Sequence, residues 1–163
     1  EVFDEKSGKR VIPRVIEPTF GMDRVFLAVI TQGYEFNEKR QNVVLKLPAF
    51  LAPIKASIFP IIKDDKMVNI AEEIYDMLRM EWNVSYDASG SVGRRYSRAD
   101  EIGTPMCITV DEESEKDKCV TIRERDSTEQ VRVKIKELKN VVREVVNGES
   151  LLKLGKKVNT RVK

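Results

Sequence analysis

The sequence of 163 residues contains no histidine, only two cysteines, and no apolar run approaching the roughly 20 residues that cross a membrane. The absence of histidine excludes Ser-His-Asp and Cys-His catalysis, zinc sites with histidine ligands, and imidazole general bases. Cys107 and Cys119 are too few for a tetrahedral metal site made of cysteine alone. Because both lie in apolar, β-branched segments, we expect reduced core thiols rather than a disulfide.

The charge is almost balanced, with 29 Lys and Arg against 27 Asp and Glu and a net charge of +2. A strongly basic coat for nonspecific nucleic-acid binding is therefore missing, although local basic patches remain open. Hydrophobic residues make up 41% of the chain, which is enough for a packed core. Since no signal peptide or membrane span is evident, we expect a cytoplasmic protein without a membrane partner. The first residue is Glu1, so we expect a piece of a longer protein.

From residue 55 onward, strand patterns alternate with amphipathic helix patterns. The order β-α-β-α-β-β-β-α predicts an α/β domain of three layers, in which helices flank a mixed five-stranded sheet. The expected strands cover 55–62, 83–87, 106–111, 119–124 and 130–135, and the expected helices cover 67–81, 94–102 and 138–146.

The first third of the chain does not fit that unit. Val11–Ile16 has the composition of a strand, 17–21 of a turn, and 22–30 of a helix, whereas 34–41 suggests a loop. We expect residues 1–50 to be the end of another domain plus a linker, and 51–148 to be the α/β domain. Residues 149–163 form a basic tail that contains Lys153, Lys156, Lys157, Arg161 and Lys163.

Residues 15–24 place a glycine-containing turn between a strand and a helix whose first turn holds Asp23 and Arg24. The amides of such a helix start can face an anion, and an arginine there can neutralise charge or stack on a base. On spacing alone, a tight turn with Asp23 as cap and a solvated Arg24 is the favoured alternative.

Residues 87–103 carry Arg94, Arg95, Arg98 and Tyr96 after a Gly/Ser loop at a strand end, where ligands of open α/β sheets bind. Arginine and tyrosine together suit unstacked RNA bases. The alternative is ion pairing with the acids of the same helix. Arg123 and Arg125 share one face of a predicted strand near this loop, or else form a solvated face paired with neighbouring acids.

Five segments in order match one family. Residues 11–24 are similar to a VIPxVIEPSFGxDR stretch, 44–55 to LxLP…LAPxK, and 86–96 to YDxSGSIGRRY; 98–105 and 122–126 match as well. Together they resemble the C-terminal part of archaeal and eukaryotic-type glycyl-tRNA synthetases. The first stretch contains motif 3 of the class II synthetases, and the second enters their anticodon-binding domain.

The resemblance implies roles for individual residues. Arg24 occupies the position of the motif 3 arginine that contacts ATP. Glu17, Pro18 and Thr19 occupy the turn that binds glycine, where a carboxylate suits the substrate ammonium. The family has Ser at the position of Thr19, so the hydroxyl is kept and a methyl group is added.

The implied RNA partner is the anticodon stem-loop of tRNA(Gly), with phosphate and base contacts from Arg94, Arg95, Arg98, Arg123 and Arg125. The full-length enzyme would be a homodimer that uses ATP and Mg²⁺ to form glycyl-adenylate and then glycyl-tRNA. Motifs 1 and 2 lie upstream in the family. We therefore expect this segment alone to bind no cofactor or metal and to be inactive.

Three other interpretations remain open. One is a sister anticodon-binding domain of histidyl, prolyl or threonyl type. Another is a noncatalytic nucleic-acid-binding module of the same fold, like the accessory subunit of mitochondrial DNA polymerase. The last is an α/β domain without any RNA role.

Overall fold

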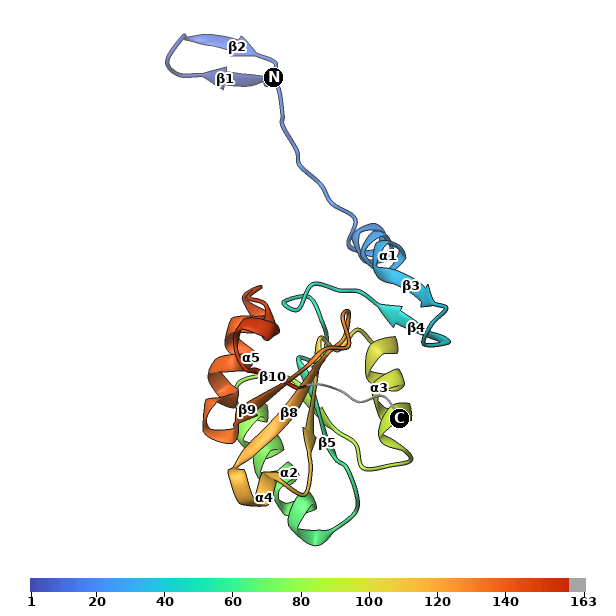
Figure 1. Cartoon of the computed structure of the whole chain (residues 1–163). Coiled ribbons are helices and arrows are strands. Elements are labelled where there is room, and N and C mark those ends of the chain that lie inside the picture. Colours follow the sequence, from blue (N-terminus) through green and yellow to red (C-terminus); the bar gives the residue numbers. More distant parts are fainter. Residues whose placement is uncertain (159–163) are drawn as a thin grey trace.

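The computed structural model describes residues 1–158, so Arg161 and Lys163 of the predicted basic tail lie outside the described residues. Figure 1 shows one compact α/β unit and an N-terminal hairpin that is joined to it by an extended stretch. The strands are β1 (Val2–Asp4), β2 (Lys9–Val11), β3 (Tyr34–Asn37), β4 (Asn42–Leu45), β5 (Ala56–Pro60), β6 (Val84–Tyr86), β7 (Met106–Val110), β8 (Cys119–Glu124), β9 (Gln130–Lys134) and β10 (Lys156–Val158). The helices are α1 (Met22–Gly33), α2 (Asp65–Arg79), α3 (Val92–Glu101), α4 (Ser114–Asp117) and α5 (Leu138–Val146), with short 3-10 turns at Ile135–Glu137 and Leu151–Lys153.

The main sheet is mixed, as the sequence predicts, and its strands run in the order β10-β9-β8-β7-β5-β6. β5 pairs in parallel with β6 and β7, and the β7–β8, β8–β9 and β9–β10 pairs are antiparallel. The parallel half results from two β-α-β crossovers, and the antiparallel half from hairpins.

The prediction of five strands is wrong, because the sheet has six. The additional strand, β10, comes from the segment that was expected to be only a basic tail. Its Lys157 pairs with Val131 of β9. A close backbone approach makes this pairing possible: a Cβ atom on Gly155 would lie 2.8 Å from Val133 Cγ2 and 2.9 Å from Val131 Cβ.

Helices cover the two faces of the sheet unequally (Figure 1). α2 and α5 bury apolar side chains at helical spacing in one large core, against the strand residues that point to that face. Asp64 caps α2 by accepting a hydrogen bond from the Lys66 amide at 3.1 Å. α3 lies on the other face, where Ala99 and Tyr96 pack against Phe59 and Cys107.

The segment before residue 50 differs from its predicted form. The expected strand 11–16 is wrong for most of its length: only Val11 is in a strand, paired with Val2, and residues 12–20 have no neighbouring strand. The helix at 22–30 is confirmed within α1. The expected loop 34–41 contains β3, which forms a hairpin with β4.

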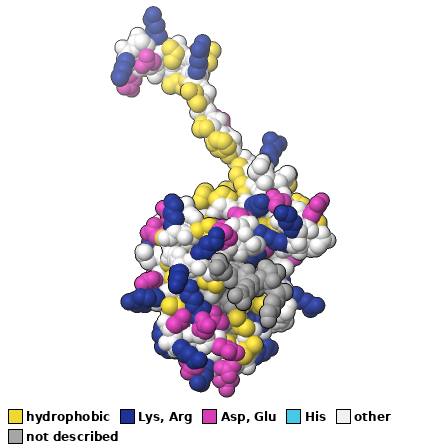
Figure 2. All heavy atoms as spheres, viewed as in Figure 1, with side chains coloured by type: hydrophobic (Ala, Val, Ile, Leu, Met, Phe, Trp, Pro, Cys, Tyr) yellow, Lys and Arg dark blue, Asp and Glu magenta, His cyan; other side chains and the backbone are white. Residues whose placement is uncertain are grey.

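Apolar side chains of the N-terminal segment lie in solvent, including Ile16, Phe20 and Phe26, which are 93%, 83% and 65% exposed. Figure 2 shows hydrophobic side chains along the extended stretch that leads away from the compact unit. No helix among residues 1–158 is both long and apolar enough to cross a membrane.

Candidate nucleic-acid interface

The loop after β6 is fixed to α3 by one carboxylate. Asp87 Oδ1 accepts the Ser89 amide at 2.8 Å, and Asp87 Oδ2 accepts Arg98 Nη2 at 2.5 Å. Arg98 also donates to the Ser89 carbonyl at 2.8 Å. Partial burial opposes ionisation, but the Ser89 amide and the Arg98 guanidinium together hold the pKa of Asp87 below its ordinary value. The Gly/Ser loop therefore has a defined shape at the end of the parallel strands.

Arg95 lies inside this corner and has no carboxylate partner among the described residues. It is 4% exposed, and its guanidinium donates to the carbonyls of Pro60 and Gly90. Its Nε is buried and unbonded. Arg95 thus connects the end of β5 to the loop before α3, and it adds a positive charge just beneath the surface.

Arg123 and Arg125 are also buried, at 7% and 5% exposure. Arg123 forms a bidentate pair with Asp100, with N–O distances of 2.9 and 3.0 Å, and its guanidinium lies 4.7 Å from the centre of the Tyr96 ring. Burial opposes its charge, but Asp100 holds the pKa of Arg123 above its ordinary value. Arg125 donates to the Gly103 carbonyl and pairs with Asp126.

Arg94 differs from the other four arginines. It is exposed in the first turn of α3, and it makes no hydrogen bond or ion pair within residues 1–158. That turn contains no acid, and the Ser91 side chain does not cap the helix. A Cβ atom at Gly93 would meet nothing within 4 Å, so the backbone there is open to solvent. The turn can therefore receive an anion beside a free guanidinium.

The structure thus brings all five predicted arginines around α3 but gives four of them partners inside the protein. Direct RNA contact by Arg95, Arg123 or Arg125 would require buried bonds to open. Their predicted role in RNA binding stays a prediction.

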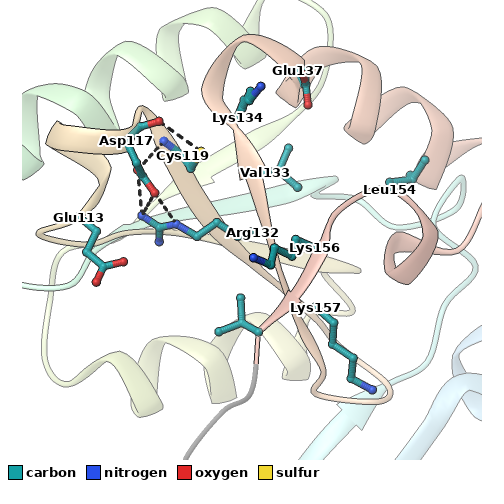
Figure 3. Close-up of a pocket in the computed structure, with 11 residues that line it drawn as sticks. Glu113, Asp117, Cys119, Arg132, Val133, Lys134, Glu137, Leu154, Lys156 and Lys157 are labelled. Atoms are coloured by element: carbon teal, nitrogen blue, oxygen red, sulfur yellow. Dashed lines mark hydrogen bonds and ion pairs between the residues drawn. The ribbon is translucent and has the colours of Figure 1, made fainter.

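A further surface, not predicted from the sequence, lies on the outer strands β8 to β10, on the sheet face that carries α3. A cavity of about 630 Å³ lies there, between α4 and strands β8 to β10 (Figure 3). Lys134 and Lys156 line it, and neither makes an ion pair within the described residues. Arg132 lines it too, held by Asp111 and Asp117. The alternation of charged residues in β9 was the available signal, since it places Arg132 and Lys134 on one face.

The four residues assigned to ATP and glycine lie apart from this surface. Glu17, Pro18, Thr19 and Arg24 are all exposed, on the extended stretch and the first turn of α1. A single hydrogen bond joins them, from Thr19 Oγ1 to Glu17 Oε1 at 3.5 Å. Within residues 1–158 they enclose no site for ATP or glycine. The described residues also contain no group of three or more acids and cysteines placed to hold a metal ion.

Comparison with known proteins gives consistent matches. The sequence model of the "Anticodon binding domain" family matches residues 53–145. A glycine–tRNA ligase of Rhodopirellula baltica is 50% identical over 139 residues, which cover 81% of this chain and 26% of that protein. A glycine–tRNA ligase of Methanocaldococcus jannaschii is 49% identical over 139 residues (85% and 24%), and one of Corynebacterium glutamicum is 44% identical over 153 residues (90% and 33%). The chain therefore spans about a quarter to a third of the length of these curated relatives.

Proposed function

Since this chain belongs to the anticodon binding domain family, we propose that it is the tRNA-binding C-terminal part of a glycine–tRNA ligase. The observation that carries the proposal is the similarity to proteins named glycine–tRNA ligase, which extends well beyond residues 53–145. It favours a ligase over a noncatalytic module of the same fold. The substrates of the whole protein would be glycine, ATP and tRNA(Gly), with Mg²⁺, in a cytoplasmic homodimer.

We further propose a division of labour along the chain. Residues 1–50 carry the motif 3 end of the catalytic domain, in which Arg24 contacts ATP while Glu17, Pro18 and Thr19 border the glycine site. All four side chains are exposed within the described residues. This supports the assignment, because exposed residues on an extended stretch can form a closed site only when another part of the catalytic domain packs against them. Residues 51–148 bind the anticodon stem-loop, and the basic segment 149–163 extends that domain.

The arginines around α3 are proposed to act in two ways. Arg94 and the half-exposed Arg98 contact RNA phosphates at the start of α3, where an unpaired guanidinium and open backbone amides lie together. Arg95, which has no carboxylate partner among the described residues, adds positive charge beneath that surface, and Arg123 and Arg125, paired with Asp100 and Asp126, hold its shape. Lys134 and Lys156 extend the basic surface across the outer strands.

The test is binding of the chain to a fluorescent RNA hairpin with the anticodon stem-loop of tRNA(Gly), measured by anisotropy over a range of salt concentrations. Arg94→Ala should weaken binding about three- to tenfold and lower the salt slope by about one. Arg79→Ala is the matched control, because it removes one exposed arginine from α2 on the opposite face of the sheet. Equal affinities and slopes for the two variants would contradict the assignment of Arg94.

A further inference from the structure

The hairpin β3–β4 connects α1 directly to α3. At one end, the Lys46 amide donates to the Gly33 carbonyl at 2.7 Å, so the last residue of α1 is bonded to the chain just after β4. On its other side, β4 lies against α3, and the buried Leu47 side chain just after β4 comes within 3.2 Å of where a Cβ atom on Gly103 would be. Gly103, at the end of α3, has φ +79°, and a Cβ atom there would lie 3.0 Å from the Leu45 carbonyl oxygen. The backbones of the two segments are therefore in close contact.

Arg40, in the turn of this hairpin, makes three hydrogen bonds to distant parts of the chain. Its Nη1 donates to Asp100 Oδ2 at 3.3 Å and to the Arg125 carbonyl at 2.7 Å, and its Nη2 donates to the Asp126 carbonyl at 2.5 Å. Its side chain is only 20% exposed. The guanidinium thus fastens the hairpin both to α3 and to the turn between β8 and β9.

Asp100 is the shared acceptor of this arrangement. Its carboxylate is 2% exposed, and it holds Arg40 from the hairpin together with Arg123 from β8. It lies in the last turns of α3, the same short helix whose first turn carries Arg94. The first turn with Arg94 and the carboxylate that holds Arg40 therefore lie on one rigid ten-residue helix, which gives a contiguous path from one to the other.

We propose that Arg40 is a positioning residue that couples the RNA-binding surface at α3 to the β3–β4 hairpin, and through it to α1. The proposal rests on the RNA-binding function proposed above. Arg40 contacts no RNA in this scheme, and its task is to make the hairpin firmer when the surface is occupied. Coupling of this kind is reciprocal, so loosening the hairpin weakens RNA binding by the same factor by which RNA stabilises the hairpin.

The experiment is amide hydrogen exchange of the 163-residue chain, free and bound to the anticodon stem-loop hairpin. In the unaltered chain, RNA should slow exchange of the β3–β4 amides about fivefold or more, a typical magnitude for coupling between sites. Arg40→Ala should abolish most of this slowing and weaken RNA binding by no more than the same factor. Arg40→Ala should leave the amide exchange rates of β5 and β7 unchanged. Faster exchange in those strands would instead indicate that the variant has lost its fold. Arg40→Lys should recover only part of the RNA-dependent slowing, because an ammonium group cannot reproduce the forked hydrogen bonds of a guanidinium group.

Lys39→Ala is the matched control, since it removes one positive charge from the same turn and Lys39 is exposed with no bonded partner among the described residues. It should behave as the unaltered chain. Binding of RNA without slower exchange in the hairpin, or equal slowing in Arg40→Ala, would overturn the coupling while leaving the proposed function intact. Failure of the unaltered chain to bind the RNA would overturn the proposed function itself.

Discussion

The two cysteines differ in burial and therefore in the expected reactivity of their thiols. Cys107 is 1% exposed beneath α3, whereas Cys119 is half-buried at the rim of the outer-sheet cavity. Burial raises the pKa of the Cys107 thiol to about 12. Since the thiolate is the nucleophile, a thiol held neutral in the core is inert. Both cysteines are free, as expected, but the expected place in the core is confirmed for Cys107 and wrong for Cys119.

We therefore predict that iodoacetamide at pH 8 alkylates Cys119 in the folded chain and leaves Cys107 unmodified. Peptide mass spectrometry gives the site, and the same reaction in urea is the control, because unfolding exposes both thiols. Alkylation of Cys107 at a rate comparable to Cys119 in the folded chain would show that the α3 side of the sheet opens readily.

Asp111 gives the protein an acid-sensitive ion pair. Burial opposes ionisation, but hydrogen bonds from Arg132 and Ser114 hold the pKa of Asp111 below its ordinary value of 3.8. Near pH 3.8 and just below it, the folded state therefore binds fewer protons than the unfolded state. The stabilisation is fully present well above pH 4 and is lost as the pH falls through the lowered pKa.

Asp111→Asn should lower the free energy of unfolding by about 1–2 kcal/mol at pH 7, because it removes charged hydrogen bonds at a partly buried site. The difference from the unaltered chain should shrink as the pH falls toward 3, as measured by urea unfolding. Glu112→Gln is the control, since Glu112 is exposed and makes no ion pair within the described residues. A penalty that stays constant from pH 7 to pH 3 would contradict a role for the ionised carboxylate.

At the scale of elements, periodicity located the core helices and strands because burial of one face enforces it. Met67, Ala71, Ile74 and Leu78 of α2 recur at helical spacing and are all buried. β3 and β10 gave no such signal. β3 is short with two exposed residues, and β10 is a lysine-containing edge strand whose position depends on Gly155 rather than on apolar alternation. Short edge strands are specified by their neighbours, which a local pattern does not reveal.

Gly155→Ala tests the attachment of β10. The added Cβ would come within 3.0 Å of β9 side chains, so we expect a loss of about 1–3 kcal/mol in unfolding free energy, typical of overpacking. Gly148→Ala is the comparison, since a Cβ atom there would meet nothing within 4 Å. Because the φ of Gly148 is +98°, any loss of stability in this variant comes from backbone strain rather than from overpacking. Exchange protection of the β10 amides should fall only in the first variant. Unchanged protection there would mean that β9 moves aside without cost.

At the scale of the whole molecule, the candidate site was predictable in composition but not in contacts. The clustering of Arg94, Arg95, Arg98, Arg123 and Arg125 followed from their place at strand ends and on one strand face. Whether a guanidinium faces solvent or a buried carboxylate depends on partners far along the chain: Asp100 is 23 residues from Arg123 and 60 from Arg40. No local pattern announces such pairs, and for this reason Arg40 did not stand out in the sequence.

The sixth strand has a consequence for the protein's behaviour in concentrated solution. The family match ends at residue 145, before β10, which hydrogen-bonds along the outer side of β9. A fragment that stops there would present a row of unpaired backbone amides and carbonyls beside the apolar Val131 and Val133. Such a bare border is a template on which another chain can add a strand. In the whole domain, a short edge strand that carries Lys156 and Lys157 takes this outer position, and a short, charged edge is a poor template for adding a strand.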